Sequence, residues 1–257
     1  MILDQLIINN NNSNEFQQNI ILLHGLFGNK NSLLSLGTFL NEHLNCKIIL
    51  LDLRNHGCSA HHPNMNYIIM SQDILDTLNF LNIYKNIIII GHSIGGKIAM
   101  FLTTILYNSI SKIIVLDIAP VCYNYSFKNI FFALEQVYIK NIVIKKQVSE
   151  IMKLYIHNKY IINMLLQSFY KGKWNFNIFF IKKAYKHISS WKILKPWVGN
   201  ILFLKGMKSN YINHIYYNDI FRQFPNAIIF NIPNAGHFLH VENIDSVYKR
   251  ILNFCLQ

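Results

Sequence analysis

Short runs of aliphatic residues that end in glycine, aspartate or proline recur along this chain of 257 residues. Continuous apolar runs of this length are typical of strands that are buried on both faces, as in a parallel sheet. The segments between the first four runs carry apolar residues at the spacing of a helix. An alternation of strands and helices predicts an α/β fold with a doubly wound, mostly parallel sheet. The predicted strands are residues 19–25, 47–52, 86–91, 112–117, 200–206 and 227–233.

The alternation stops after Ala119-Pro120 and resumes near Asn200. The residues between these points show apolar stripes at helical spacing and no clear strand. We therefore expect one α/β core, formed by residues 1–121 and 198–257. The intervening residues 122–197 are expected to form a helical lid subdomain over the site.

The composition and the start of the chain indicate a globular protein of the cytoplasm. Apolar residues make up 52% of the chain, which argues against disorder. The longest aliphatic run, residues 87–90, is too short to span a bilayer, so we expect no membrane partner. The start lacks the basic segment of a secretory signal, and the asparagine-rich residues 9–14 predict an exposed turn between two early strands. Free thiols in a reducing compartment are expected of the cysteines, Cys46, Cys58, Cys122 and Cys255.

The formal net charge of +12 suggests a nucleic-acid partner, but the distribution of that charge argues against one. The excess is almost all lysine without arginine-rich clusters, and only Arg54, Arg222 and Arg250 are arginines. A genome rich in A/T codons explains the abundance of lysine together with that of isoleucine, asparagine, tyrosine and phenylalanine. We therefore expect no nucleic acid as a partner.

The motifs of the chain imply no cofactor and no metal. Neither a Gly-x-Gly-x-x-Gly nor a P-loop sequence is present, so no nucleotide cofactor is expected. His56, His61 and His62 suggest a metal site, but no carboxylate or cysteine stands at ligand spacing beside them. Asp52 and Arg54, which follow a predicted strand, are interpreted as braces of a loop near the site.

The sharpest motif is Gly91-His-Ser-Ile-Gly95, a Gly-x-Ser-x-Gly sequence between an apolar run and a helical stripe. A strand-to-helix turn this tight needs small residues around the serine, and it lifts the hydroxyl above the sheet. The same turn aims the hydroxyl toward the N-terminus of the helix, where backbone N–H groups point outward. The context predicts that Ser93 is a nucleophile rather than part of an inert glycine-rich turn.

A serine hydroxyl needs a base to remove its proton, and His237 is the best candidate. It follows the last predicted strand and precedes the C-terminal helix, in the sequence Ala235-Gly236-His237. A late histidine after the serine and the acid fits the chain order of hydrolases with this turn. His240 is the local competitor, and it is interpreted as ordinary surface in the first turn of the helix.

A negatively charged oxygen that develops on the substrate needs two backbone donors. One is expected to be the N–H of Ile94, at the start of the helix after the serine. The other is expected from His24-Gly-Leu-Phe-Gly28, where the glycines permit an unusual backbone path. We assign it to Leu26, with Phe27 as the alternative.

The acid is the least obvious member of the predicted site. The loop after residues 200–205 is its usual place, but Ser209 stands there and no carboxylate follows until Asp219, in a predicted helix. Asp117 ends the preceding strand, on the edge of the sheet where ligands of α/β folds bind. We therefore expect Asp117 to orient His237, with Ser209 as a supporting hydrogen-bond partner. The alternative is that Asp117 is only a helix-cap or loop acid.

Five segments in order, at matching spacing, resemble the YbfF family of bacterial serine esterases, and the resemblance covers nearly the whole chain. It implies an α/β-hydrolase fold with a helical lid, no cofactor, and activity on short acyl esters or acyl thioesters. It also implies Ser93 as nucleophile, His237 as base and Asp117 as acid, with Ser209 beside the histidine. The segments are His24-Gly-Leu-Phe-Gly28, Asp52-Leu-Arg-Asn-His-Gly57, Gly91-His-Ser-Ile-Gly-Gly-Lys97, Leu116-Asp-Ile-Ala-Pro120 and Ala235-Gly-His237.

The sequence therefore predicts a serine carboxylesterase or thioesterase whose partner is a small-molecule acyl ester or thioester. Two other functions use the same architecture. A lyase or synthase of the menaquinone-pathway type is favoured by an arginine-lined pocket, and a hydrolase-fold binding protein lacks turnover. The natural substrate and the oligomeric state are not encoded in any motif that we identify.

Overall fold

The computed structural model describes residues 1–9, 18–124 and 126–257, so the predicted asparagine-rich turn lies outside the described residues except for Asn9. Within these ranges a seven-stranded sheet forms in the order β1-β3-β2-β4-β5-β8-β9. β1 pairs antiparallel with β3, and all other neighbours are parallel. The strands are β1 (Gln5–Asn9), β2 (Gln18–Leu23), β3 (Cys46–Leu51), β4 (Ile87–His92), β5 (Ile110–Leu116), β8 (Asn200–Gly206) and β9 (Ala227–Ile232).

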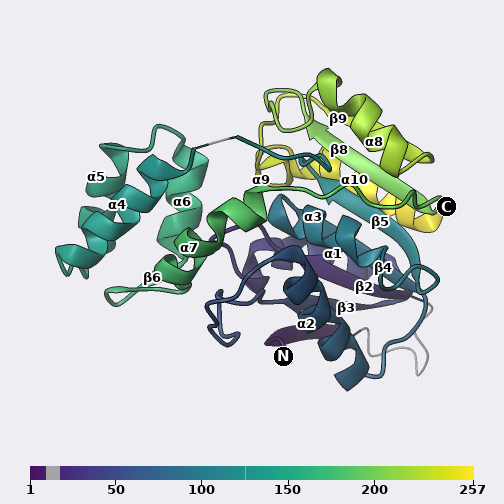
Figure 1. Cartoon of the computed structure of the whole chain (residues 1–257), viewed down its shortest axis with the longest axis horizontal. Coiled ribbons are helices and arrows are strands. Elements are labelled where there is room, and N and C mark those ends of the chain that lie inside the picture. Colours follow the sequence, from purple (N-terminus) through teal and green to yellow (C-terminus); the bar gives the residue numbers. More distant parts are fainter. Residues whose placement is uncertain (10–17, 125) are drawn as a thin grey trace.

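Helices cover both faces of this sheet (Figure 1). Successive side chains of a strand point to opposite faces, which explains why continuous aliphatic runs are needed here. Ile48 and Leu50 of β3 belong to the core under α1 and α10, whereas Ile49 and Leu51 belong to the core under α2, α3 and α8. The predicted doubly wound, mostly parallel sheet is confirmed. The elements around it are η1 (Lys30–Leu33), α1 (Leu34–His43), α2 (Tyr67–Phe80), α3 (Ile94–Leu102), η2 (His214–Tyr216), α8 (Tyr217–Gln223), α9 (Leu239–Glu242) and α10 (Ile244–Leu256).

The chain leaves the sheet after β5 and returns to it at the neighbouring strand β8. Figure 1 shows the helices of this stretch gathered at one side of the sheet, with α7 leading back to the core. A hairpin of two short strands interrupts the helices, where the sequence showed no clear strand. The elements are α4 (Lys128–Ile139), α5 (Lys145–Lys153), α6 (Lys159–Gln167), β6 (Phe169–Tyr170), β7 (Lys173–Trp174) and α7 (Ile178–Ser189). We call this stretch, residues 122–197, the helical insertion.

Backbone hydrogen bonds attach the helical insertion to the loop after β3. The N–H of Gly57 donates to the carbonyl of Asn175 over 2.8 Å, and the N–H of Asn177 donates to the carbonyl of Asn55 over 2.8 Å. The insertion is therefore fixed at a point far from its two ends in sequence. No helix within the described ranges has the length and apolar character needed to cross a bilayer.

Candidate active site

Ser93 lies at the turn between β4 and α3, at the carboxyl edge of the sheet. Its backbone has φ 52° and ψ −117°, a conformation that non-glycine residues rarely adopt. A Cβ atom on Gly91 would lie 2.3 Å from the backbone of Gly95, and one on Gly95 would lie 2.3 Å from the carbonyl oxygen of Leu23. The two glycines are therefore required by close backbone approach, as the motif predicted.

His237 and Asp117 meet above this edge, although they are 120 positions apart in sequence. The Nδ1–H of His237 donates to Oδ2 of Asp117 over 2.8 Å, and the carboxylate is completely buried. Oδ1 of Asp117 accepts from the N–H of Gly206 over 3.0 Å, and Oδ2 also accepts from the hydroxyl of Ser209. These donors hold the carboxylate in one orientation toward the imidazole.

Two further contacts hold His237, one at its ring and one at its backbone. The ring of Tyr211 stacks on it with 3.8 Å between centroids and 20° between planes. The Nε2–H of His92 donates to the backbone carbonyl of His237 over 2.8 Å. Tyr211 was missed by the sequence analysis, because nothing in the pattern around it distinguishes it from a loop tyrosine.

The interpretation of His240 as surface is wrong. The residue lies in the first turn of α9, but its side chain is only 7% exposed. Its ring lies 4.5 Å from that of His92, measured between centroids, because α9 packs this residue against the strand that leads to Ser93. Burial lowers the pKa of His240 to about 4 and holds the pKa of His92 well below its usual range. Both rings are therefore neutral near pH 7.

Ser93 and His237 line a common cavity of about 50 Å³. Leu26 lines it too, together with apolar side chains of the helical insertion such as Ile161 and Met164. Among the described residues no hydrogen bond joins the hydroxyl of Ser93 to the ring of His237. In enzymes without bound substrate, such bonds are often long and tighten only in the complex.

Two backbone N–H groups beside Ser93 have no acceptor within the described part of the chain. They belong to Leu26, in the loop after β2, and to Ile94, the first residue of α3, where a helix leaves its N–H groups unpaired. The N–H of Phe27 instead donates to Nε2 of His56 over 3.1 Å. The N–H of Phe27, the alternative donor, is therefore already hydrogen-bonded, and His56 is its acceptor.

Other predicted acidic and basic residues lie elsewhere. Asp219 pairs with Arg222 on the exposed side of α8 over 2.7 Å. Asp52 accepts from the N–H of Lys30 over 2.6 Å and from that of Cys58 over 2.8 Å, which ties the loop after β2 to the loop after β3. Arg54 forms a bidentate ion pair with Asp73 of α2, with hydrogen bonds of 2.6 and 2.7 Å. Both are braces, as interpreted from the sequence.

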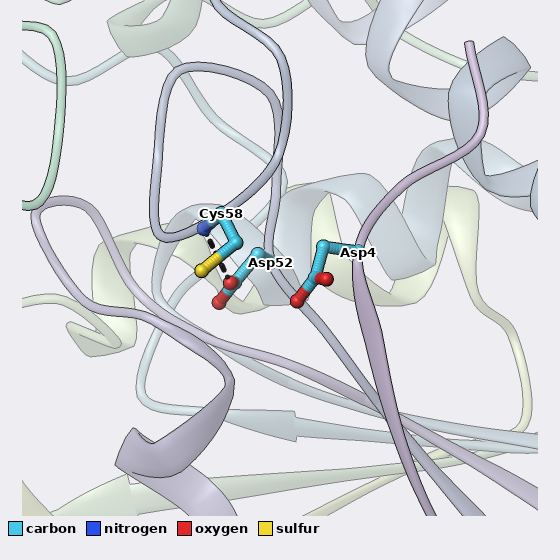
Figure 2. A group of neighbouring side chains, drawn as sticks. All are labelled: Asp4, Asp52 and Cys58. Atoms are coloured by element: carbon cyan, nitrogen blue, oxygen red, sulfur yellow. Dashed lines mark hydrogen bonds between the residues drawn. The ribbon is translucent and has the colours of Figure 1, made fainter.

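One group of side chains in the described ranges has the composition of a metal site. Asp4, Asp52 and Cys58 lie close enough together for one atom of each to approach a single ion (Figure 2). The ammonium of Lys30 already pairs with both carboxylates, with 3.3 Å to Asp52. The local negative charge is therefore compensated by the protein itself. His61 and His62, the other candidate ligands, are exposed and outside this group.

Lys97 is a buried charge beside the site that the sequence analysis did not single out. It lies one helical turn after Ser93, its side chain is only 2% exposed, and it lines a second cavity of about 50 Å³ together with Ser93 and Leu26. Burial lowers the pKa of its ammonium to about 7. A signal was present, because a lysine follows Gly95 and Gly96 on a helix that is otherwise apolar.

Comparison with known proteins agrees with this geometry. The model of the alpha/beta hydrolase fold family matches residues 18–244. Esterase YbfF of Escherichia coli (strain K12) is 38% identical, with 91% of this chain and 92% of that protein covered. The sn-1-specific diacylglycerol lipase ABHD11 of Xenopus laevis is 31% identical over 91% of this chain and 78% of its own. A solved structure named marine microorganism esterase superposes with a TM-score of 0.89 at 32% identity, covering 98% of this chain and 99% of its own. The chain belongs to the alpha/beta hydrolase fold family.

Proposed function

We propose that this protein is a serine esterase that hydrolyses small acyl esters or acyl thioesters through an acyl-enzyme on Ser93. The observation that carries the proposal is the buried Asp117–His237 pair beside a serine on a strained strand-to-helix turn. Relatives named as esterases support an ester as the bond that is cleaved.

In the first half of the reaction, the hydroxyl oxygen of Ser93 attacks the carbonyl carbon and Nε2 of His237 takes its proton. The N–H groups of Leu26 and Ile94 bind the negatively charged oxygen of the tetrahedral intermediate. Asp117 stabilises the imidazolium, which then gives its proton to the leaving alcohol or thiol. In the second half, water attacks the acyl-enzyme by the same steps, and the carboxylic acid and free Ser93 are released.

The helical insertion supplies apolar walls to the cavities at Ser93, including Phe127 and Ile188. We propose that residues 122–197 act as a lid over the α/β core of residues 1–121 and 198–257. Closure of such a segment excludes water, which strengthens the interactions that stabilise the transition state. The small cavity volumes, about 50 Å³ each, favour short acyl groups.

A lyase or synthase acting on a polyacidic substrate needs arginines at the site. Arg54 pairs with Asp73, Arg222 pairs with Asp219, and Arg250 lies over the ring of Phe230 at 3.6 Å. These contacts favour the esterase over the lyase.

We also propose a cytoplasmic location, which is supported by the unpaired state of all four cysteines.

The activity should rise with pH through one ionisation between pH 5 and 8. A histidine that accepts the proton of Ser93 must be neutral, and imidazole ordinarily loses its proton in this range. His92 and His240 do not produce the rise, because burial keeps the pKa of each below it. The measurement is kcat/KM for a short p-nitrophenyl ester across this range. A flat profile would contradict a histidine base. Lys97→Met should show the same rise of kcat/KM with pH, which would exclude the ammonium of Lys97 as the ionising group.

Ser209→Ala should lower kcat about tenfold, because one hydrogen bond from a hydroxyl to the carboxylate of Asp117 is lost while the N–H of Gly206 still holds the other oxygen. Steady-state kinetics with the same ester measure this effect. The exposed Ser111 offers a matched control, and Ser111→Ala should leave kcat unchanged. A loss as large as that of Asp117→Asn would show that Ser209 does more than support the acid.

A further inference from the structure

The ammonium of Lys97 is buried beside Ser93 without a carboxylate. Its backbone N–H donates to the carbonyl of Ser93 over 3.1 Å, which places it one turn along α3. No ion pair within the described ranges includes it. A buried charge without a partner is costly, so the surroundings must compensate it.

The compensation comes from backbone carbonyls. Nζ of Lys97 donates to the carbonyl oxygens of Val121, Ser189 and Ser190 over 2.7, 3.2 and 3.1 Å. Ser189 is the last residue of α7, and the carbonyls at a helix C-terminus are unpaired and carry a partial negative charge. The ammonium therefore caps α7 from a different helix.

Aromatic rings surround the same ammonium. Nζ lies 4.9 Å from the centroid of Tyr123, 5.7 Å from that of Trp191 and 5.8 Å from that of Tyr67. Ring faces attract a cation at these distances. Together with the carbonyls they form a cage, defined here as Val121, Ser189, Ser190 and the three rings, that offsets part of the cost of burying the ammonium.

The cage joins the two ends of the helical insertion. Val121 lies where the chain leaves the core, and Ser189 and Ser190 lie where it returns. The two ends also bond directly, because the N–H of Tyr123 donates to the carbonyl of Ser189 over 3.1 Å. One ammonium thus ties both junctions to the helix that begins beside Ser93.

Lys97 is also part of the wall of the second cavity at Ser93, with Ile118, Ile188 and Ser189. We propose that Lys97 is a positioning residue, which holds both ends of the insertion against α3 and closes the acyl end of this cavity. The length of the acyl chain that the cavity accepts is then set by Lys97 and by the two junctions that it holds. This inference rests on the proposed esterase function.

Lys97→Ala tests the inference through the ratio of kcat/KM for p-nitrophenyl hexanoate to that for the acetate. Shortening the side chain opens the end of the cavity, and each methylene that becomes buried favours the longer ester about fourfold. We expect the ratio to rise about tenfold or more. The matched control is Lys183→Ala, on the exposed side of α7, which should keep the wild-type ratio. An unchanged ratio in folded Lys97→Ala overturns the inference.

Lys97→Met tests the attachment separately, because it keeps the length of the side chain and removes the donors. We expect faster hydrogen exchange at the amide of Tyr123 and in the peptide around residues 188–191, with α10 unchanged and with wild-type exchange in Lys183→Met. Exchange at the wild-type rate at both junctions overturns the inference. If Lys97→Ala does not fold, the ester ratio is measured on Lys97→Met, where release of the two junctions should raise it at least twofold, and an unchanged ratio again overturns the inference.

These outcomes are distinct from a failure of the proposed function. If the wild-type protein hydrolyses no ester and its Ser93 does not react with a fluorophosphonate, the esterase proposal fails. If the wild type turns over acetate while the Lys97 variants match it in ester ratio and exchange, only the inference about Lys97 fails.

Discussion

Replacing Ser93 by alanine should lower kcat for a short acyl ester by about 10³-fold or more, the magnitude seen when a catalytic triad loses its nucleophile. The variant has no oxygen to form the acyl-enzyme, so only binding and the backbone donors of Leu26 and Ile94 remain. The fold should be retained, because Ser93 makes no side-chain hydrogen bond within the described residues and alanine is smaller.

A fluorophosphonate probe provides the direct measurement. The wild-type protein should be labelled on one peptide that contains Ser93, and Ser93→Ala should not be labelled. The control Ser111→Ala changes an exposed serine on β5 and should be labelled as the wild type is. Label on another serine, or none on the folded wild-type protein, would refute the assignment of the nucleophile.

Asp117→Asn should lower kcat by about 10²- to 10⁴-fold with a modest change in KM. The carboxylate accepts from Nδ1–H of His237, and in the proposed mechanism it stabilises the imidazolium that forms as Ser93 attacks, an effect realised mainly in the transition state. An amide lacks the negative charge, and it favours the wrong tautomer of the imidazole when its N–H₂ group faces the ring.

The measurement is steady-state kinetics on a variant whose thermal unfolding shows that it is folded, since Asp117 is completely buried. Asp219→Asn is the control, because that carboxylate pairs with Arg222 on the surface of α8 and should leave kcat near the wild-type value. Near-wild-type turnover in Asp117→Asn, with loss of turnover in Asp219→Asn, would mean that the acid is wrongly assigned.

Local patterns in the sequence determined the parallel strands and the turn that carries Ser93. Aliphatic runs bounded by glycine, aspartate or proline predicted the six parallel strands, because a strand buried on both faces needs apolar residues at nearly every position. The glycines around Ser93 predicted the strand-to-helix turn for a similar local reason, since a Cβ atom at Gly91 or Gly95 would collide with neighbouring backbone. Such constraints act on residues close in sequence, so they are visible in it.

Tertiary structure decided the contacts between distant elements. Asp117 lies within reach of His237 because only β8 separates β5 from β9 in the sheet, and elimination among carboxylates only hinted at that pairing. His240 looked exposed from its helical position, yet α9 packs it against His92. The sequence did not distinguish Lys97 from the other lysines. In the structure its buried ammonium donates to a carbonyl at the end of α7, 92 positions later. Periodicity reports which face of an element is apolar, whereas the burial of a polar side chain depends on which other element comes to lie over it.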